Sequence, residues 1–540
     1  MISTTRVSTT LRTTLITVGL ATLLAGCPAQ KESGIQPLSN PTISDTEHDD
    51  SVVSSTAPVF PEEAFRDKQP AGGQPRDFNL PGITEFKLGK QIDVFLVERH
   101  ELPTISIELN FDGGTVSDRL GREGTASVCM SMVSEGTKKL DKLAFEEAQA
   151  NIASGISSYA GTETQGVSMY TLSKNFEATF SLFSDTIREP GLRSAELSRM
   201  IKRRVESLKQ SKGSPGSIAG RIANSIMVGQ KHPFGRITTE QSLGKIKLSD
   251  CKRYHKSYVR PNGARLFIVG DMTQAQVVAA FTPLLTSWKG SPRKLAKLPA
   301  PKSRAGRVFF VDVPGAAQSS IYLGHMGPGR SDASYFANQM MAGVLGGGFS
   351  SRINMNLREA KGYTYGARGN FTYNRHFGFF LASSSVRSDA THQSIKELFS
   401  EMAALKSGVR PALAQELDRE KNGAILGLPA RFSTARQVLS MYRTLVYYGL
   451  PMSYYNDYVG NYSKVTLEQV NAAAATLLHP EDALVLVVGD GSATQIKRDD
   501  EGNDVATQQT LLDTLAEVAK SELGGAGSLV ILDADGNVKH

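Results

Sequence analysis

The chain contains an internal duplication, and this feature limits its possible architecture more than any other. When the sequence is displaced by 219 positions, residues 245–271 align without a gap with residues 464–490. Both segments read as a helix, a turn marked by Pro261 or Pro480, a continuous apolar strand and a final Val-Gly-Asp turn. The same run of elements at two places predicts two copies of one structural unit.

A second match extends the duplication. At an offset of 214, the alternating strand at residues 105–111 pairs with residues 319–325. The body of the chain therefore divides into two related halves, near 83–290 and 301–498, joined by a linker at 291–300 that is rich in Lys, Arg and Pro. Within each half, strands and helices mix without strict alternation, which predicts an α+β fold with helices layered on a sheet.

The N-terminus reads as a targeting signal. Residues 1–27 hold two arginines and then an apolar run from Leu15 to Ala25, which is too short to cross a bilayer of about 30 Å as a helix. The run ends in Leu-Ala-Gly-Cys27, which resembles the lipobox of bacterial lipoproteins. This resemblance implies that Cys27 becomes the lipidated first residue of the mature chain. Because Pro28 rather than Asp follows, it also implies an outer-membrane anchor facing the periplasm.

Two further segments flank the duplicated body. Residues 28–82 are rich in Ser, Thr, Pro and acidic residues without periodicity, which predicts a flexible tether. Residues 499–540 form a C-terminal tail with helical spacing at 505–523, a strand at 529–532 and a turn at 533–536 that lacks the closing Glu of a calcium loop. The net charge of +7 is spread over 540 residues without a basic stripe, which argues against a nucleic-acid partner.

A helix early in the first half carries the frame of a known zinc motif. From Gly124 to Thr137 it reads Gly-Thr-Ala-Ser-Val-Cys-Met-Ser-Met-Val-Ser-Glu-Gly-Thr. This segment resembles the pitrilysin or insulinase family of zinc peptidases, which includes mitochondrial processing peptidase and whose inverted motif is His-x-x-Glu-His. The resemblance rests here on Gly124, Ala126, Met132, Gly136 and Thr137 and extends over both halves. It implies duplicated processing-peptidase-like domains.

The residues that perform the chemistry in that family are replaced. Ser127 and Ser131 stand where two zinc-binding histidines are expected, and Met130 stands where a glutamate should activate water. Such a site needs two imidazoles one helical turn apart and a carboxylate, whereas a hydroxyl is a poor zinc ligand and a thioether is no base. The third ligand position falls near Glu206 or Ser207, and the alignment favours Ser207. We therefore expect no metal and no other cofactor in this chain.

The second half keeps the better preserved part of the family pattern. Residues 345–366 contain Gly-Gly-Gly-Phe-Ser-Ser-Arg, then Leu-Arg-Glu and Gly-Tyr-Thr-Tyr, and look like the family segment Gly-Gly-x-x-Ser-Ser-Arg…Leu-Arg-Glu…Gly-x-x-Tyr. The resemblance implies that Arg358 and Tyr365, with Arg352, bind substrate backbone and stabilise the oxyanion. A glycine-rich turn before an ordinary amphipathic helix is the structural alternative. A phosphate-binding loop is weaker, because the Gly-Lys-Ser/Thr ending is missing.

Several other residues have structural interpretations. The basic run 202–204 is interpreted as a solvated helix face rather than a binding patch. His232 is interpreted as a structural histidine beside a Pro turn, because no second His or Cys stands near it. Cys129 and Cys251 are interpreted as buried free thiols rather than a disulfide, because Cys129 lies in an apolar stretch.

These observations lead to one main functional hypothesis and two alternatives. The resemblance implies a zinc-free, lipid-anchored subunit that binds peptide and supplies its Arg/Tyr pair to a composite site with a zinc-carrying peptidase partner. The first alternative is a peptide-binding or scaffold lipoprotein of the cell envelope with no role in proteolysis. The second is an active zinc endopeptidase whose ligands have moved elsewhere in the chain.

Overall fold

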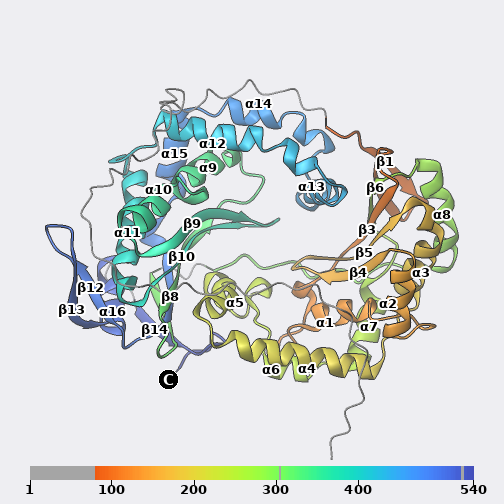
Figure 1. Ribbon diagram of the computed structural model, residues 1–540, viewed down its shortest axis with the longest axis horizontal. Coiled ribbons are helices and arrows are strands. Elements are labelled where there is room, and N and C mark those ends of the chain that lie inside the picture. The colour runs from red at the N-terminus through yellow and green to blue at the C-terminus, as the bar shows by residue number, and fades with distance from the viewer. Residues whose placement is uncertain (1–79, 303–305, 524–527, 540) are drawn as a thin grey trace, which may run out of the picture. The chain divides into compact units, whose positions relative to one another are not determined.

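The computed structural model describes residues 80–302, 306–523 and 528–539. The signal expected at 1–27, including Cys27, and nearly all of the tether lie outside these residues. The described chain forms two α/β halves, each a mixed sheet with helices (Figure 1). This arrangement confirms the predicted fold class.

The first half is built on a six-stranded sheet with the order β1-β2-β6-β3-β5-β4. Neighbouring strands are antiparallel except β2 and β6, which are parallel. The apolar strand β6 is buried along nearly its whole length, as expected of a central strand covered on both faces. The strands are β1 (Thr84–Leu88), β2 (Ile92–Glu98), β3 (Thr104–Asp112), β4 (Gly155–Ala160), β5 (Thr164–Leu172) and β6 (Ala264–Gly270).

The second half repeats this plan in a sheet with the order β14-β7-β11-β8-β10-β9. The predicted repeats become equivalent strands, since β11 and β8 take the positions of β6 and β3. The two sheets differ in one edge strand. In the first sheet this strand is β1, which is antiparallel to β2, whereas in the second it is β14, from the expected tail, which is parallel to β7. The strands are β7 (Arg307–Asp312), β8 (Gln318–Gly327), β9 (Thr364–Tyr373), β10 (Gly378–Arg387), β11 (Leu484–Gly489) and β14 (Ser528–Leu532), with a separate hairpin of β12 (Thr494–Arg498) and β13 (Asp504–Thr510).

Helices cover both sheets and follow an equivalent order in the two halves. The helices of the first half are α1 (Thr125–Val133), α2 (Lys142–Asn151), α3 (Phe176–Arg188), α4 (Ser194–Ser211), α5 (Pro215–Val228), α6 (Glu240–Gly244), α7 (Leu248–Tyr258) and α8 (Gln274–Ser287). Those of the second half are α9 (Tyr335–Ala342), the π-helical η5 (Gly343–Gly347), α10 (Arg352–Asn354), the π-helical η6 (Met355–Ala360), α11 (Thr391–Ser407), α12 (Ala414–Leu426), α13 (Ala435–Tyr448), α14 (Tyr458–Ser463), α15 (Leu467–Leu477) and α16 (Leu511–Ser521).

The two halves exchange one helix each. Helix α5 of the first half packs on strands β8 and β11 of the second sheet, with Ile222 and Ile226 buried against Leu486. Helix α13 of the second half packs on β6 and β3 of the first sheet, where Leu439 joins the same apolar cluster as Val269. Figure 1 shows α5 beside β8 and α13 beside β6. Because each sheet is covered by a helix of the other half, the two cores depend on each other.

The expected C-terminal tail is part of the second half. It supplies α16 and β14, close to the helix and strand predicted there. Residues 533–536 form a turn, as predicted, in which the Gly536 amide donates to the Asp533 carbonyl at 2.9 Å. The Asp535 carboxylate lies 2.6 Å from Lys212, at the end of α4, and 2.8 Å from Arg221, on α5. The turn therefore ties the C-terminal segment to the first half.

The prediction of free thiols is wrong. Cys129 on α1 and Cys251 on α7 are joined by a disulfide, and both residues are buried. The apolar stretch around Cys129 is the helix face that packs on α7, so the feature read as evidence for a buried thiol also places its partner. A further finding is that none of the helices in the described ranges has both the length and the apolar character needed to cross a membrane.

Candidate functional site

The degenerate motif lies on α1, whose start is held by a buried acid. The Asp118 carboxylate accepts hydrogen bonds from the Gly124 amide at 2.8 Å and the Ala126 amide at 2.7 Å, which satisfies free donors at the helix start. Gly124 has a φ of 92°, in the left-handed region that favours glycine. Burial raises the pKa of Asp118 to about 7. The preserved glycine thus allows a left-handed turn directly before the helix.

The three residues at the family's catalytic positions differ in their burial and in the direction of their side chains. Met130 is fully buried in the core of the first half, so its side chain faces away from any substrate. Ser127 and Ser131, one helical turn apart, are partly exposed and share a face. That face meets a single cation from helix α4.

The cation is the guanidinium of Arg204. Its Nη1 donates to Ser127 Oγ at 2.7 Å, and its Nη2 donates to Ser131 Oγ at 2.7 Å and to the Ser127 carbonyl at 3.3 Å. The residue that faces the motif is therefore neither Glu206 nor Ser207. Glu206 is exposed and pairs with Lys209 at 3.1 Å, and Ser207 is exposed.

The solvated-face interpretation of the basic run is correct for two of its members and wrong for Arg204. Lys202 and Arg203 are exposed, whereas Arg204 is partly buried. A sequence signal for this was present, because Leu197 and Met200, the buried residues of α4, lie seven and four positions before Arg204. An arginine on the apolar stripe of an amphipathic helix faces inward.

Arg204 has no counter-ion among the residues that the structure describes. Within the described ranges, no carboxylate oxygen lies within 4.0 Å of its guanidinium, so its partners are neutral oxygens only. Burial, and secondarily the charge of Arg203, lowers the pKa of Arg204, although an arginine stays protonated at neutral pH. Two serine hydroxyls around a fixed cation offer none of the donors that zinc takes from proteins. The residues present at this motif do not fit a zinc ion.

The motif helix lies beside the edge strand β4. Ser158 on β4 donates its hydroxyl to the Met130 carbonyl and lies 2.8 Å from the Ser134 hydroxyl. Across the hairpin, the Gly161 amide donates to the Thr164 carbonyl. The backbone amides and carbonyls of the odd-numbered residues of β4 therefore point toward β5. The Ile156 amide points the other way and donates to the Gln149 side chain. By the same alternation, the backbone amides of residues 158 and 160 also point to the free edge of β4.

A cavity of about 1130 Å³ runs along these strands and is bounded by α13. Its lining includes Ser157, Tyr159 and Tyr170 from the first sheet and Arg443 from α13. Arg443 lies 3.0 Å from both carboxylate oxygens of the buried Glu108, which also accepts the Tyr159 hydroxyl at 2.6 Å. An ion pair between the halves therefore forms part of the cavity wall.

In the second half, the two residues expected to bind substrate are available to solvent. Tyr365, at the start of β9, is 87% exposed. Arg358 on η6 has its side chain 40% exposed, lies 3.2 Å from Glu359 and stacks over the ring of Phe349 at 4.8 Å. No hydrogen bond or ion pair joins either residue to the α1 motif in the described parts of the chain.

Arg352, expected to bind substrate with them, is paired with an acid of α12. Its side chain is only 12% exposed and forms a two-point ion pair with Glu416 at 2.6 and 2.8 Å. Its remaining donors reach the carbonyls of Arg410 and Pro411. All three nitrogens of this guanidinium are thus engaged by other groups of the protein.

The edge of β9 is less open than the edge of β4. The Ala367 amide donates to the side chain of Asn354 at 3.0 Å, and Gly369 forms a bridge with Gly346. The glycine-rich segment therefore packs closely against β9, where a Cβ at Gly346 would lie 2.3 Å from the Gly369 nitrogen. This contact explains Gly346 without a phosphate ligand, whereas a Cβ at Gly348 would meet nothing within 4 Å.

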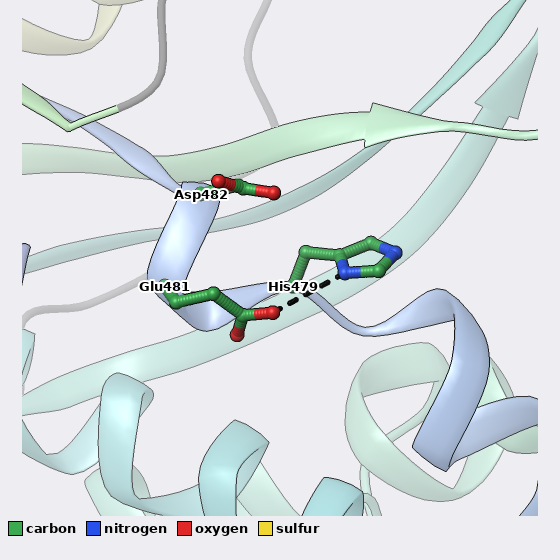
Figure 2. Close-up of side chains that lie close together, drawn as sticks. All are labelled: His479, Glu481 and Asp482. Atoms are coloured by element: carbon green, nitrogen blue, oxygen red, sulfur yellow. Dashed lines mark hydrogen bonds and ion pairs between the residues drawn. The ribbon is translucent and has the colours of Figure 1, made fainter.

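One group of metal-ligating residues occurs among those that the structure describes. His479, Glu481 and Asp482 lie together on one short turn (Figure 2). Glu481 is already paired with Lys406, and it and Asp482 are exposed. The neighbouring His325 is buried, which lowers its pKa to about 4, and its Nε2 accepts the His479 amide at 3.2 Å. His479 and Glu481 are therefore engaged by other groups of the protein.

His232 is structural, as predicted. It is buried, its Nδ1 accepts the Phe234 amide at 3.2 Å, and its Nε2 lies 3.0 Å from the Pro299 carbonyl. Both ring nitrogens are therefore used, and no ligand position is left.

Comparison with known proteins agrees with this geometry. The family described as "Insulinase (Peptidase family M16)" matches residues 93–219, and "Peptidase M16 inactive domain" matches residues 245–423. A curated Helicobacter pylori protein named "Non-peptidase homolog YmxG" is 22% identical over 389 residues, which is 71% of this chain and 88% of the relative. Another from the same organism, "Zinc protease PqqE", is 21% identical over 48% of this chain and 59% of its own length.

Solved structures share the fold. The M16 inactive domain from Pseudomonas fluorescens superposes with a TM-score of 0.70 and 23% identity over 76% of this chain and 98% of its own. The periplasmic protease PqqL from Escherichia coli has a TM-score of 0.65 and 17% identity over 80% of this chain and 48% of its own. With two M16-type halves, matches in both of them and the frame of the inverted zinc motif on α1, this chain belongs to the M16 insulinase and pitrilysin family.

Proposed function

We propose that this chain is a zinc-free, non-peptidase member of the M16 family that binds peptides and works with a zinc-carrying partner. The observation that carries the proposal is the guanidinium of Arg204 between Ser127 and Ser131. A partner would supply the metal and the hydrolytic water, and this chain would supply peptide-binding surface. The likeness to a non-peptidase homolog, in an organism that also has a related zinc protease, supports such a division of roles.

The peptide-binding surface is proposed to be the free edge of β4. An extended peptide that adds a strand to a sheet needs an edge with unpaired backbone amides and carbonyls, and β4 offers the amides of residues 158 and 160 on its free edge. Ser157 and Tyr159 of the same strand line the cavity of about 1130 Å³. Since backbone groups do most of the binding, this mode favours unfolded peptides over a particular sequence.

The second part of the proposal concerns Arg358 and Tyr365. A guanidinium and a phenol are fixed donors that can meet a peptide carbonyl as negative charge develops on it. Both side chains are exposed, and the ring of Phe349 supports Arg358. We propose that this pair completes a composite site in the assembled heterodimer, and that Arg352 only supports the fold around it.

The isolated chain tests the first part. After dialysis against zinc chloride it should hold no stoichiometric zinc by mass spectrometry, and it should not cleave an unfolded peptide. Fluorescence anisotropy should nevertheless report binding of that peptide. Peptides N-methylated at one alternating set of amides should bind at least about 10-fold more weakly than peptides methylated at the other set, because only one set pairs with β4. Stoichiometric zinc with cleavage in the isolated chain would contradict the proposal.

A reconstituted pair with a partner that has an intact His-x-x-Glu-His motif tests the second part. Arg358→Ala and Tyr365→Phe should each reduce turnover, by about 100-fold for a lost oxyanion donor. Arg368→Ala is the matched control, because Arg368 is exposed on the same strand as Tyr365. Unchanged turnover in both variants would favour a scaffold without a role in proteolysis.

The proposal includes a place in the cell. We propose that residues 1–27 are removed as a lipoprotein signal, that Cys27 carries the lipid, and that 28–82 tether the halves at 83–290 and 301–498 to the outer membrane on its periplasmic side. The fold shared with a periplasmic protease is compatible with this location. Metabolic labelling with a palmitate analogue, compared between wild type and Cys27→Ser, tests it. Equal labelling would contradict the anchor.

A further inference from the structure

We propose that Arg204 is a built-in replacement for the metal ion: it links α4 to α1 as a bound zinc would, and it keeps zinc out even when ligands are available. This inference rests on the proposed zinc-free function and gives a physical reason why the chain binds no zinc. The loss of histidines alone would leave an empty site, whereas this chain holds a cation there.

The first argument is geometric. Three oxygen acceptors converge on one guanidinium, two from hydroxyls and one from a carbonyl, at 2.7, 2.7 and 3.3 Å. The two hydroxyls belong to positions 127 and 131, from which paired imidazoles on a helix would reach one ion. A planar guanidinium with a fork of donors spans two such positions, whereas the single ammonium of a lysine would be a point charge.

The second argument concerns charge. The acceptors around Arg204 are neutral, so its positive charge is not cancelled locally within the described ranges. A zinc ion entering the same space would meet an uncompensated cation in a partly buried site, where electrostatic repulsion is stronger than in bulk water. An arginine does not lose its proton at neutral pH, so the repulsion cannot be relieved by deprotonation.

The third argument is the contrast with Arg203. Arg203 is exposed and has no hydrogen bond or ion pair to any residue that the structure describes. One position along the same helix, Arg204 points at the motif and uses both terminal nitrogens. The neighbour therefore provides a control with the same chemistry and helix.

A double-mutant cycle tests the structural role. Arg204→Ala and the pair Ser127→Ala/Ser131→Ala should each raise the unfolding equilibrium constant by about 10-fold or more, since hydrogen bonds to a charged group are lost. Combining them should add little to the larger effect, because they remove the same interaction. Arg203→Ala should have almost no effect. Equal effects of Arg204→Ala and Arg203→Ala would overturn the link between the helices.

Metal binding tests the exclusion. Ser127→His/Ser131→His, with Arg204 in place, should bind zinc at least about 100-fold more weakly than the same variant with Arg204→Glu, which supplies a third ligand and removes the cation. Ser127→His/Ser131→His/Arg203→Glu controls for added negative charge and should behave like the double variant. The readout is zinc per chain after dialysis, together with competition against a chelating dye.

The outcomes separate this inference from the proposed function. Zinc in the wild-type chain contradicts the proposed function. Stoichiometric zinc in the double variant, with none in the wild type, overturns only the role of Arg204. A folded variant with Arg204→Glu that still takes up no zinc also overturns it, because another feature must then exclude the metal. Should that variant fail to fold, the double variant and the stability cycle still decide.

Discussion

Arg352 and Glu416 form a two-point ion pair, with Nε to Oε1 at 2.8 Å and Nη2 to Oε2 at 2.6 Å. The two side chains are 12% and 15% exposed, so little solvent screens them. The pair joins the start of α10 to the start of α12, directly before the segment that carries Arg358. Its role is to hold that segment in place.

Arg352→Ala should lower the free energy of unfolding by about 3–5 kcal/mol, because it leaves the Glu416 carboxylate buried without its partner. Arg358→Ala, at an exposed position nearby, should change stability by less than about 0.5 kcal/mol. Urea denaturation followed by circular dichroism measures both. Equal stability of the two variants would show that the ion pair is not a support.

The burial of Asp118 predicts a pH effect on stability. The folded chain holds this proton to about pH 7, whereas the usual pKa is 3.8. The stabilising contribution is therefore fully present below about pH 4 and is lost as the pH rises through about 7. Asp118→Asn cannot titrate at this position. Between about pH 4 and pH 7, the free energy of unfolding of the wild type should therefore fall relative to that of Asp118→Asn, by at most about 4 kcal/mol.

Denaturation of both proteins at several pH values checks this prediction. Above about pH 8 the two stability curves should run parallel, because Asp118 is then ionised in both the folded and the unfolded chain. A constant difference between pH 4 and 7 would mean that the carboxylate stays charged, held by the Gly124 and Ala126 amides.

The Cys129–Cys251 disulfide closes a loop with a sequence separation of 122. In the chain-entropy account, a loop of this length contributes up to about 5 kcal/mol, so Cys129→Ala/Cys251→Ala should be clearly less stable than wild type. Titration of thiols in denaturant without reductant should detect neither cysteine in the wild type. Two reactive thiols, assigned to these positions by peptide mapping, would contradict the bond.

The contact between Arg443 and Glu108 predicts a local effect on α13. Arg443→Ala should weaken the hold of this helix on the first sheet by about 2 kcal/mol, between the values of exposed and buried pairs. Hydrogen exchange in α13 should then quicken relative to wild type. Arg436→Ala, an exposed arginine on the same helix, is the control. Unchanged exchange in Arg443→Ala would assign the contact no role in docking.

The sequence predicted local elements better than the pairing of distant ones. The repeated strands and their equivalence followed from an offset that any single-chain comparison detects, because periodicity and turn residues are local signals. The parallel pairing of β14 with β7 and the disulfide depend on contacts between distant segments, which local pattern does not encode. The exchange of α5 and α13 was missed for the same reason.

The candidate site shows a similar division. The replacement of the zinc ligands at positions 127, 130 and 131 was visible residue by residue. The cation between them was not, because Arg204 stands in a basic run whose other members, Lys202 and Arg203, are exposed. Its spacing from Leu197 and Met200 was the overlooked clue. The ion pair between Arg352 and Glu416 could not be predicted, because a motif does not reveal which distant side chain its arginine contacts.

The exchange of α5 and α13 has a consequence for the order in which the chain folds. Helix α5 is synthesised before the sheet that it covers, and the first sheet is complete before α13 exists to cover it. Until the second half emerges, each of these apolar faces lacks its native cover, and exposed apolar surface of this kind favours aggregation. The two duplicated halves therefore form a single cooperative folding unit. Dividing the gene between the halves would yield two aggregation-prone fragments.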